Sequence, residues 1–302
     1  SSYVLGKLAR GQRIGREYVG HNASYVRTYI RPAFPALPLT GIKTHLLEDF
    51  AMKLKRTTTL SNRSINAILM AATVPLGEAA RLGLIDINPA VNLHRLGNDT
   101  TEKGIPTVEE MRALLILTEI DPRIRCAILL GAACALRLGE VQAIRLCDIG
   151  EAVVTIQHSW GKLDGLKETK TARSRMVPLP MTVRSELMDL AARNPHGSEG
   201  YLIFGKSPDS PLDVRAIERG FYKALERIGI DSAVRVERSL SFHSLRHWNN
   251  AMLRGAVSDE KLRLLTGHSP VAMTNRYDHI TEADLLELAK AQESRLLPLM
   301  SS

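Results

Sequence analysis

The sequence has few cysteines, few aromatic residues and no long apolar run. Its three cysteines show neither a metal-ligand spacing nor a disulfide framework, so we interpret them as buried, reduced thiols: Cys126, Cys134 and Cys147. Aromatic residues make up 5% of the chain against 44% hydrophobic residues, which is typical of helix-rich proteins rather than of β-sandwiches. No apolar segment is long enough to cross a bilayer, and no signal peptide is visible. We therefore expect a cytoplasmic protein that has no membrane partner.

The charge balance favours a polyanionic partner. Lys and Arg number 40 against 32 Asp and Glu, which leaves a net charge of +8. Such an excess indicates nucleic acid, although a solvated basic surface is the ordinary alternative. The bias is strongest in residues 1–31, which hold the single acid Glu17 and six bases: Lys7, Arg10, Arg13, Arg16, Arg27 and Arg31. We interpret this segment either as one that lies along phosphates or as the exposed face of an amphipathic helix.

The chain length and one polar stretch predict two domains. A chain of 302 residues is longer than one average domain. Residues 1–96 carry apolar residues at helical spacing, with Ser61 as a helix cap and Pro75 placed to kink or interrupt the helix. Residues 97–105 have the composition of a linker. We therefore expect a small helical domain, a linker, and a second domain over residues 106–302.

The second domain is predicted to be mainly helical with a small antiparallel sheet. A capping-box pattern opens one helix at Thr107, and Asp121 followed by proline opens another. Short β-branched or apolar segments at 153–160 and 175–179 predict the sheet. Further helices are expected to begin near residues 182, 213, 243, 258, 270 and 282. The fold class is therefore mainly α, with the sheet confined to this domain.

Five places in the second domain set polar or cationic residues in apolar surroundings, and four of them rest on a single residue. Arg137 is expected in a tight turn between two helices, where the helix dipole also favours an ordinary surface arginine. Lys170 is expected at a turn before the second strand segment, as many surface lysines are. His268 follows a glycine at a helix end, where a capping role is the alternative, and Tyr277 ends a short helix, where packing is the alternative.

The fifth place is the sequence His-Ser-Leu-Arg-His, which begins at His243. On a helix, His243, Arg246 and His247 share one face, because residues three and four apart are neighbours. The two histidines have the spacing of a zinc pair, but no third ligand has an obvious place. A face of histidine and arginine is better suited to an anion such as phosphate.

In this order and spacing, the five places resemble the catalytic signature of the tyrosine site-specific recombinases of the phage integrase family. The resemblance covers about residues 105 to 280, and the first domain resembles the core-binding domain of that family. It assigns seven catalytic residues: Arg137, Glu140, Lys170, His243, Arg246, His268 and Tyr277. The residues Trp248-Asn249-Asn250 depart from the family pattern, which affects the packing behind the site rather than its chemistry.

The resemblance implies that Tyr277 attacks a DNA phosphodiester and forms a 3′-phosphotyrosine, with neither metal nor ATP as a cofactor. Arg137 and Arg246 would stabilise the charge that develops on the phosphate. His243 would take the tyrosine proton, and Lys170 would protonate the leaving 5′-oxygen. His268 would hydrogen-bond the phosphate. Because the covalent bond keeps the energy of the phosphodiester, rejoining follows the same steps in reverse.

The family resemblance also implies the partners. They are double-stranded DNA recombination sites, clamped between the two domains, other copies of the chain in a homotetramer on two duplexes, and accessory DNA-bending proteins at a bacterial nucleoid. Two alternatives remain open: relaxation of DNA in the manner of a type IB topoisomerase, and a catalytically silent DNA-binding regulator on the same scaffold. The chain begins with Ser1 rather than Met, so we expect a trimmed form, and we recognise no extra N-terminal arm-binding domain.

Two helical segments carry further expectations. One presents bases at every fourth position, with apolar residues on the opposite side: Arg215, Arg219, Lys223 and Arg227. We interpret this row as a stripe that faces DNA, or else as a solvated basic face. The segment after Thr281 predicts a terminal helix with an apolar stripe. That stripe must be buried, either on its own domain or, as in many family members, on a neighbouring subunit.

Overall fold

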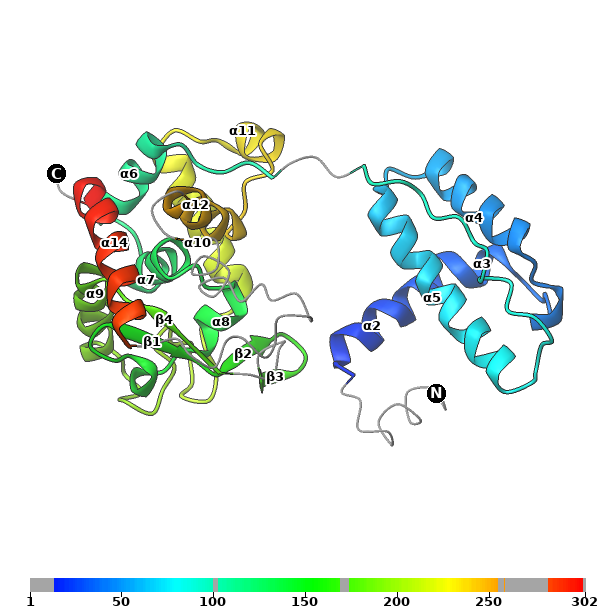
Figure 1. Ribbon diagram of the computed structural model, residues 1–302, viewed down its shortest axis with the longest axis horizontal. Coiled ribbons are helices and arrows are strands. Elements are labelled where there is room, and N and C mark those ends of the chain that lie inside the picture. Colours follow the sequence, from blue (N-terminus) through cyan, green and yellow to red (C-terminus); the bar gives the residue numbers. More distant parts are fainter. Residues whose placement is uncertain (1–13, 100–102, 169–173, 255–257, 259–281, 301–302) are drawn as a thin grey trace. The chain divides into compact units, whose positions relative to one another are not determined.

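The chain forms two compact units, Ser1–Glu102 and Lys103–Ser302, in a computed structural model (Figure 1). The structure describes residues 14–99, 103–168, 174–254, 258 and 282–300. The division falls inside the polar stretch 97–105. Within the described ranges, no helix is long and apolar enough to cross a membrane.

The smaller unit is helical where the structure describes it. Ser61 caps the longest helix as predicted, because its hydroxyl accepts a hydrogen bond from the Ser64 N–H at 3.2 Å. That helix continues through Pro75. The proline therefore does not interrupt the helix. Leu76, the next residue, is buried in a cluster that includes Leu47, and this packing stabilises the helix beyond the proline. The elements are α2 (Arg16–Tyr25), a π-helical turn (Val26–Ile30), α3 (Arg31–Ala33), a 3-10 turn (Leu39–Gly41), α4 (Thr44–Thr57) and α5 (Asn62–Arg81).

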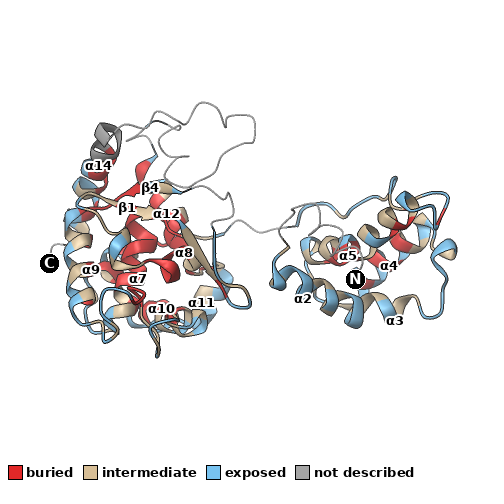
Figure 2. Cartoon of the chain, turned by 90° about the horizontal axis from the view of Figure 1, so that it is seen from below, coloured by how far each residue is buried: buried red, intermediate tan, exposed pale blue. Residues whose placement is uncertain are grey.

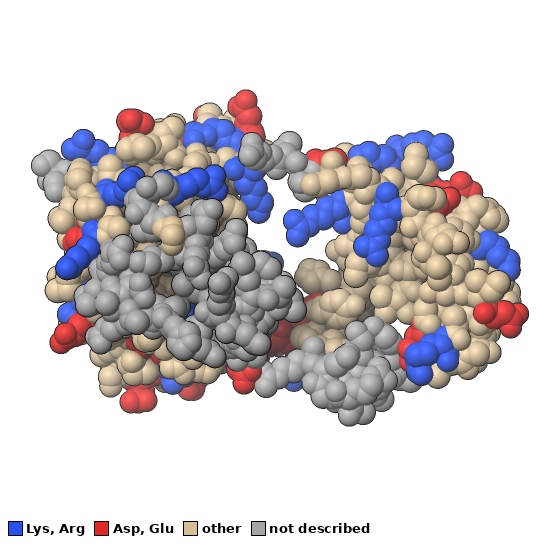
Figure 3. All heavy atoms as spheres, in the orientation of Figure 1, with Lys and Arg blue, Asp and Glu red and all other residues tan. Residues whose placement is uncertain are grey.

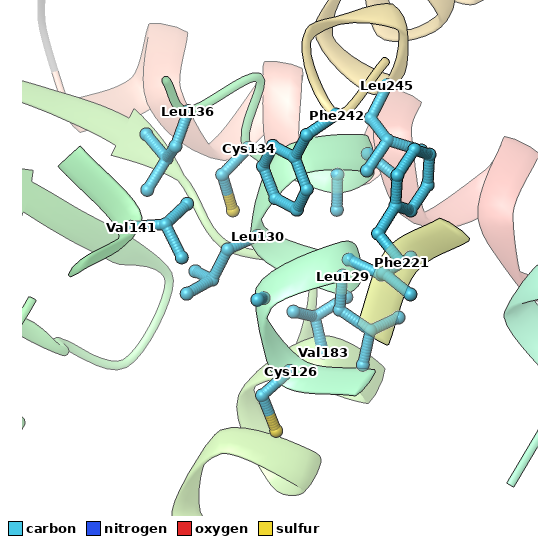
Figure 4. Close-up of a cluster of buried hydrophobic side chains, with 14 of the residues drawn as sticks. Cys126, Leu129, Leu130, Cys134, Leu136, Val141, Val183, Phe221, Phe242 and Leu245 are labelled. Carbon is cyan, nitrogen blue, oxygen red and sulfur yellow. The ribbon is translucent and has the colours of Figure 1, made fainter. Parts of the chain in front are cut away.

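The larger unit surrounds one buried helix, α7. Every residue of α7 from Cys126 to Ala133 is buried, and helices and strands cover it on several sides (Figures 2 and 4). The helices are α6 (Val108–Ile116), α7 (Pro122–Ala133), α8 (Leu138–Ala143), α9 (Met181–Ala192), α10 (Val214–Arg227), α11 (Ser232–Glu237), α12 (His243–Leu253) and α14 (Glu282–Met300), with a 3-10 turn at Leu146–Asp148. The helix α11 was not predicted, and the helices expected near residues 258 and 270 lie outside the described residues.

The helix caps of this unit and two of its three cysteines agree with the sequence, whereas Cys147 is exposed rather than buried. Thr107 and Glu110 form the predicted capping box, and the Asp121 carboxylate accepts from the N–H of Arg123 at 2.9 Å. Cys126 and Cys134 are buried free thiols, and burial raises the pKa of each to about 12. They are therefore protonated and act as small apolar residues of the core.

The predicted antiparallel sheet is present, but as two separate strand pairs. Strand β1 (Val153–Ile156) pairs with β4 (Arg175–Pro178), with Ile156 opposite Arg175. Strand β2 (His158–Gly161) pairs with β3 (Gly165–Glu168). The segment 153–160 is thus not one strand, as expected, but breaks at residue 157. The break occurs because β1 and β2 pair with different strands, and the chain reverses between β2 and β3 at Gly165, whose φ of 66° suits a hairpin.

The terminal helix α14 packs against its own unit. Its buried residues include Leu288, Gln292 and Leu296, and it lies against α6, α9, α12 and β4. The apolar stripe of the tail helix is therefore buried on its own domain, which is the first of the two alternatives expected for it. The predicted cap Thr281 lies outside the described residues.

Candidate active site

Arg137 lies in the turn between α7 and α8, as predicted. Its backbone is extended, with φ −72° and ψ 152°, and α8 begins at the next residue. Its Nη1 atom donates to Oε1 of Glu140 at 2.9 Å, and 36% of its side chain stays exposed. Among the residues that the structure describes, Nε and Nη2 of Arg137 have no hydrogen-bond partner. With respect to the described residues, the guanidinium is therefore held at one nitrogen and unbonded at the other two.

Glu140 is a buried carboxylate at the centre of the site, with 2% of the residue exposed. It accepts from the backbone N–H of Arg137 at 2.9 Å, from Nη1 of Arg137, and from both terminal nitrogens of Arg175 at 3.0 and 2.8 Å. Burial opposes its ionisation, but the hydrogen bonds and charge of Arg175, with those of Arg137, outweigh burial and lower the pKa of Glu140. Glu140 is therefore an ionised anchor for two arginines.

Arg246 extends from α12 toward the same turn. The residue is 1% exposed, and its Nη1 donates to the carbonyl oxygen of Ala135 at 2.6 Å. Ala135 has a φ of 52°, which reverses the chain after α7 and points this carbonyl at Arg246. Burial, followed by the charge of Arg137, lowers the pKa of Arg246 to about 10. Arg246 remains protonated at neutral pH and adds a second cation to the site.

His243 and His247 lie in the first turns of α12, with their rings edge to face at 4.7 Å between centroids. Burial, then the neighbouring charges of His247 and Arg246, lowers the pKa of His243 to about 4. His247 is shifted in the same direction, chiefly by burial. Both rings are therefore neutral at pH 7 and able to accept a proton. Within the described part of the chain, no group of three His, Cys, Asp or Glu side chains could hold a metal ion.

Two buried amides that we did not predict support the turn between α7 and α8. Asn249 Nδ2 donates to the carbonyl oxygens of Ala132 and Ala133 at 2.7 and 2.9 Å, and Gln292 Nε2 donates to Ala133 at 2.8 Å. These carbonyls end α7 and have no partner within the helix. Asn249 belongs to the triplet that departs from the family pattern, and its neighbour Trp248 is buried in the core. The departure thus fixes the helix end that precedes Arg137.

Gly139 permits β2 to lie directly on α8. A Cβ atom at this position would come within 2.6 Å of the Ser159 hydroxyl and 2.7 Å of the Trp160 carbonyl oxygen. The glycine between Arg137 and Glu140 is therefore needed for close packing rather than for a special backbone angle.

Arg175 is the main site residue that the sequence analysis missed. It is the first residue of β4, and both of its terminal nitrogens donate hydrogen bonds to Glu140. One signal was available: a glutamate in an apolar helix needs a buried cation, and Arg175 is the one base of the strand segment that was predicted. Three of the predicted catalytic residues, Lys170, His268 and Tyr277, lie outside the described residues.

The basic row on α10 is exposed at all four positions, while Ile217 and Phe221 on the other side are buried. Arg219 Nε donates to the backbone of Arg215, and Arg227 donates to the carbonyl oxygen of Glu119. On the drawn face of the larger unit, Lys and Arg side chains gather in the upper part of the view (Figure 3). The predicted DNA contacts Lys7, Arg10 and Arg13 lie outside the described residues.

Comparison with known proteins places this site in a family. The sequence model of the phage integrase family matches residues 105–284. The XerD tyrosine recombinase of Corynebacterium glutamicum is 26% identical over 224 residues, which is 72% of this chain and 69% of that protein.

Solved structures of other integrases share the fold. One is the Tn1549 transposon integrase in complex with transposon right end DNA, with a TM-score of 0.73, 19% identity and 98% of each chain covered. Another is the lambda integrase tetramer bound to a Holliday junction, with a TM-score of 0.67, 17% identity and coverage of 91% of this chain and 77% of that one. Because the family match extends over more than half of the sequence, the chain belongs to the phage integrase family, the tyrosine site-specific recombinases.

Proposed function

We propose that this recombinase cleaves and rejoins DNA at specific sites through a 3′-phosphotyrosine bond to Tyr277. The observation that supports this most directly is that Arg137, which pairs with Glu140, lies close enough to Arg246 and His243 to lower the pKa of both, in a member of this family. Two guanidinium groups, one open and one buried, together with neutral imidazoles make a site suited to one phosphate group.

The electrostatics of the cluster favour an anion. The guanidinium groups of Arg137 and Arg175 bind the carboxylate of Glu140, and that of Arg246 lies close enough for the charges of all three residues to shift its pKa. The mutual repulsion of these cations contributes to the lowered pKa of Arg246, as their charge does for His243. A phosphodiester would relieve that repulsion, and the additional negative charge of the transition state would relieve it further. Stabilisation that grows toward the transition state is what accelerates the step.

The neutral histidines supply the proton acceptor. A tyrosine hydroxyl has an ordinary pKa near 10 and must lose its proton to attack phosphorus. We assign this role to His243, whose pKa of about 4 keeps the ring unprotonated at neutral pH. Lys170 would protonate the 5′-oxygen as the phosphodiester bond breaks, and His268 would hydrogen-bond the phosphate. The hydroxyl proton and the leaving-group proton are thus handled by different residues, and no external energy source is needed.

The family match favours recombination over relaxation by a type IB topoisomerase and over a silent regulator. We infer that the substrate is duplex DNA and that a homotetramer joins two duplexes, because the solved lambda integrase is a tetramer on a Holliday junction. The smaller unit would be the core-binding domain and the larger unit the catalytic domain. The exposed bases of α10 support a DNA-facing role for Arg215, Arg219 and Lys223. Arg219 and Arg227 each also donate to a backbone carbonyl, so Arg215 and Lys223 are the candidates whose side chains have no such bond among the described residues.

The proposal is tested by trapping the covalent intermediate. A duplex recovered by binding selection from a random-sequence library is nicked near the cleavage position and incubated with the full chain. Wild-type protein should form a protein–DNA adduct that resists denaturant. Tyr277→Phe removes one oxygen and little volume, so it should bind the duplex with unchanged affinity and form no adduct. An adduct with the phenylalanine variant would show that another residue is the nucleophile, and no adduct with wild type would refute the proposed reaction.

A further inference from the structure

We propose that Arg175 is a positioning residue that keeps the Arg137 guanidinium available to the DNA phosphate. The inference rests on the proposed function, because it concerns the same site. It starts from one buried carboxylate, Glu140, which two arginines share in unequal ways.

Arg175 lies on the buried face of its strand. Val177, two residues on, is fully buried, whereas Met176 between them is 51% exposed. Side chains alternate between the faces of a strand, so Arg175 shares the face of Val177, and its side chain is 16% exposed. A charged group on the buried face of a strand is costly unless it is paired. The position therefore requires an anionic partner, and Glu140 is that partner.

The two arginines hold Glu140 by different geometries. Arg175 places Nη1 on Oε1 and Nη2 on Oε2, so that it spans both carboxylate oxygens. Arg137 reaches only Oε1, through Nη1, and its own backbone N–H occupies Oε2 as well. The carboxylate thus accepts four hydrogen bonds, two at each oxygen. Because every lone pair of the carboxylate is used, a second bond from the Arg137 side chain has no acceptor left.

This division of the carboxylate determines what Arg137 can do. Without Arg175, the buried charge of Glu140 would be compensated by Arg137 alone. Guanidinium and carboxylate groups match as a two-bond pair, so Arg137 would turn both of its terminal nitrogens toward Glu140. Its charge would then be neutralised and its open nitrogens lost to the phosphate. With Arg175 in place, Arg137 is tethered by one nitrogen and keeps Nε and Nη2 for the substrate.

The test measures DNA affinity and the single-turnover rate of adduct formation on the selected, nicked duplex. Arg175→Ala should bind DNA within about 2-fold of wild type, since Arg175 contacts protein groups. It should form the adduct on the order of 100-fold more slowly, which is the cost of a misplaced catalytic group. Arg175→Lys should recover part of the rate, because an ammonium keeps the charge but cannot span both oxygens. If the alanine variant does not fold, the lysine variant carries the test.

The chain offers a matched control. Arg125 near the start of α7 forms a two-bond pair with Glu186, in which 12% of the arginine side chain and 29% of the glutamate side chain are exposed. Arg125→Ala should lower thermal stability as Arg175→Ala does but leave the adduct rate of the folded protein unchanged. An adduct rate that falls equally in both variants would mean that Arg175 has only a general structural role.

Two further comparisons decide whether Arg175 acts through Glu140 and Arg137. In a Glu140→Gln background, the effect of Arg175→Ala should shrink several-fold, because no carboxylate remains to capture Arg137. An effect of equal size in both backgrounds would overturn the proposal.

On a 5′-phosphorothiolate duplex, whose sulfur leaves without a proton, Arg175→Ala should stay slow. If Arg175→Ala recovered the wild-type adduct rate on that substrate, the defect would lie in proton donation to the leaving group, and the proposal for Arg175 would be overturned.

Failure of the proposed function can be told apart from failure of this inference. If the wild type forms no adduct, the reaction is refuted, but inorganic phosphate still tests the geometry. Phosphate should raise the melting temperature of wild type by more than that of Arg175→Ala, relative to chloride at equal ionic strength. An equal rise in both proteins would overturn the role of Arg175 by itself.

Discussion

Replacement of Leu296 tests whether the tail helix α14 belongs to the fold of its own unit. Leu296 is fully buried in the main core of the larger unit, whereas its neighbour Leu297 is 43% exposed. Leu296→Ala removes three buried carbon atoms and should cost about 2–5 kcal/mol of unfolding free energy. Leu297→Ala makes the same chemical change on the surface and should cost less than about 0.5 kcal/mol. The two variants are therefore a matched pair that differs only in burial.

The assay is urea unfolding of the larger unit, followed by circular dichroism at two protein concentrations. With a denaturant dependence of about 3 kcal/mol per molar, Leu296→Ala should lower the midpoint by on the order of 1 M, and Leu297→Ala by less than about 0.2 M. Equal midpoints for the two variants would refute the packing of α14 on its own unit. A midpoint that rises with protein concentration would show that the helix docks on another copy instead.

Three further predictions follow from the site. Gly139→Ala should destabilise the larger unit by about 1–3 kcal/mol, because the new Cβ meets the Trp160 backbone, whereas Gly77→Ala in α5 meets only a side chain at 3.4 Å and should be neutral or stabilising. The free energy of unfolding should fall as the pH drops from about 6.5 toward 4, because His243 takes up a proton in the unfolded chain but, with its pKa of about 4, not in the folded one. His243→Gln should flatten this dependence of the unfolding free energy on pH. An unchanged dependence would contradict the lowered pKa of His243. Arg137→Ala should abolish the rise in melting temperature that phosphate produces over chloride in wild type, and a retained rise would show that the anion binds elsewhere.

The elements of the fold that the sequence predicted are those with local signals. The caps at Ser61, Thr107 and Asp121 are each made by side chains within three residues of the backbone that they bind. The break between β1 and β2 was not predictable in this way. An apolar run shows that a segment is extended, but its partner decides where the strand ends, and β1 pairs with a strand about 20 residues away.

The residues of the site likewise fall into those with a local sequence signal and those without one. Arg137, His243 and Arg246 stand out because they are polar or cationic residues in apolar surroundings and together match a known motif. Asn249 and Gln292 carry no such signal, although both bind the last carbonyls of α7. Their importance comes from the acceptor, which lies more than 100 residues away in the sequence. A residue that supports a site through a distant backbone group is chemically ordinary, and only the fold distinguishes it from a surface amide.

These supports converge on one short segment. The turn after α7 receives Asn249 from α12 and Gln292 from α14, while Leu288 of α14 packs on Ala135, whose carbonyl accepts from Arg246. Removal of α14 would therefore expose a buried helix end and loosen the carbonyl that orients Arg246. If the apolar stripe of α14 were buried on a neighbouring subunit, truncation after about residue 281 would leave a folded monomer. The burial of Gln292 and Leu296 argues instead that the truncated unit is destabilised. Packing of the last helix therefore helps to hold the turn that carries the proposed phosphate site.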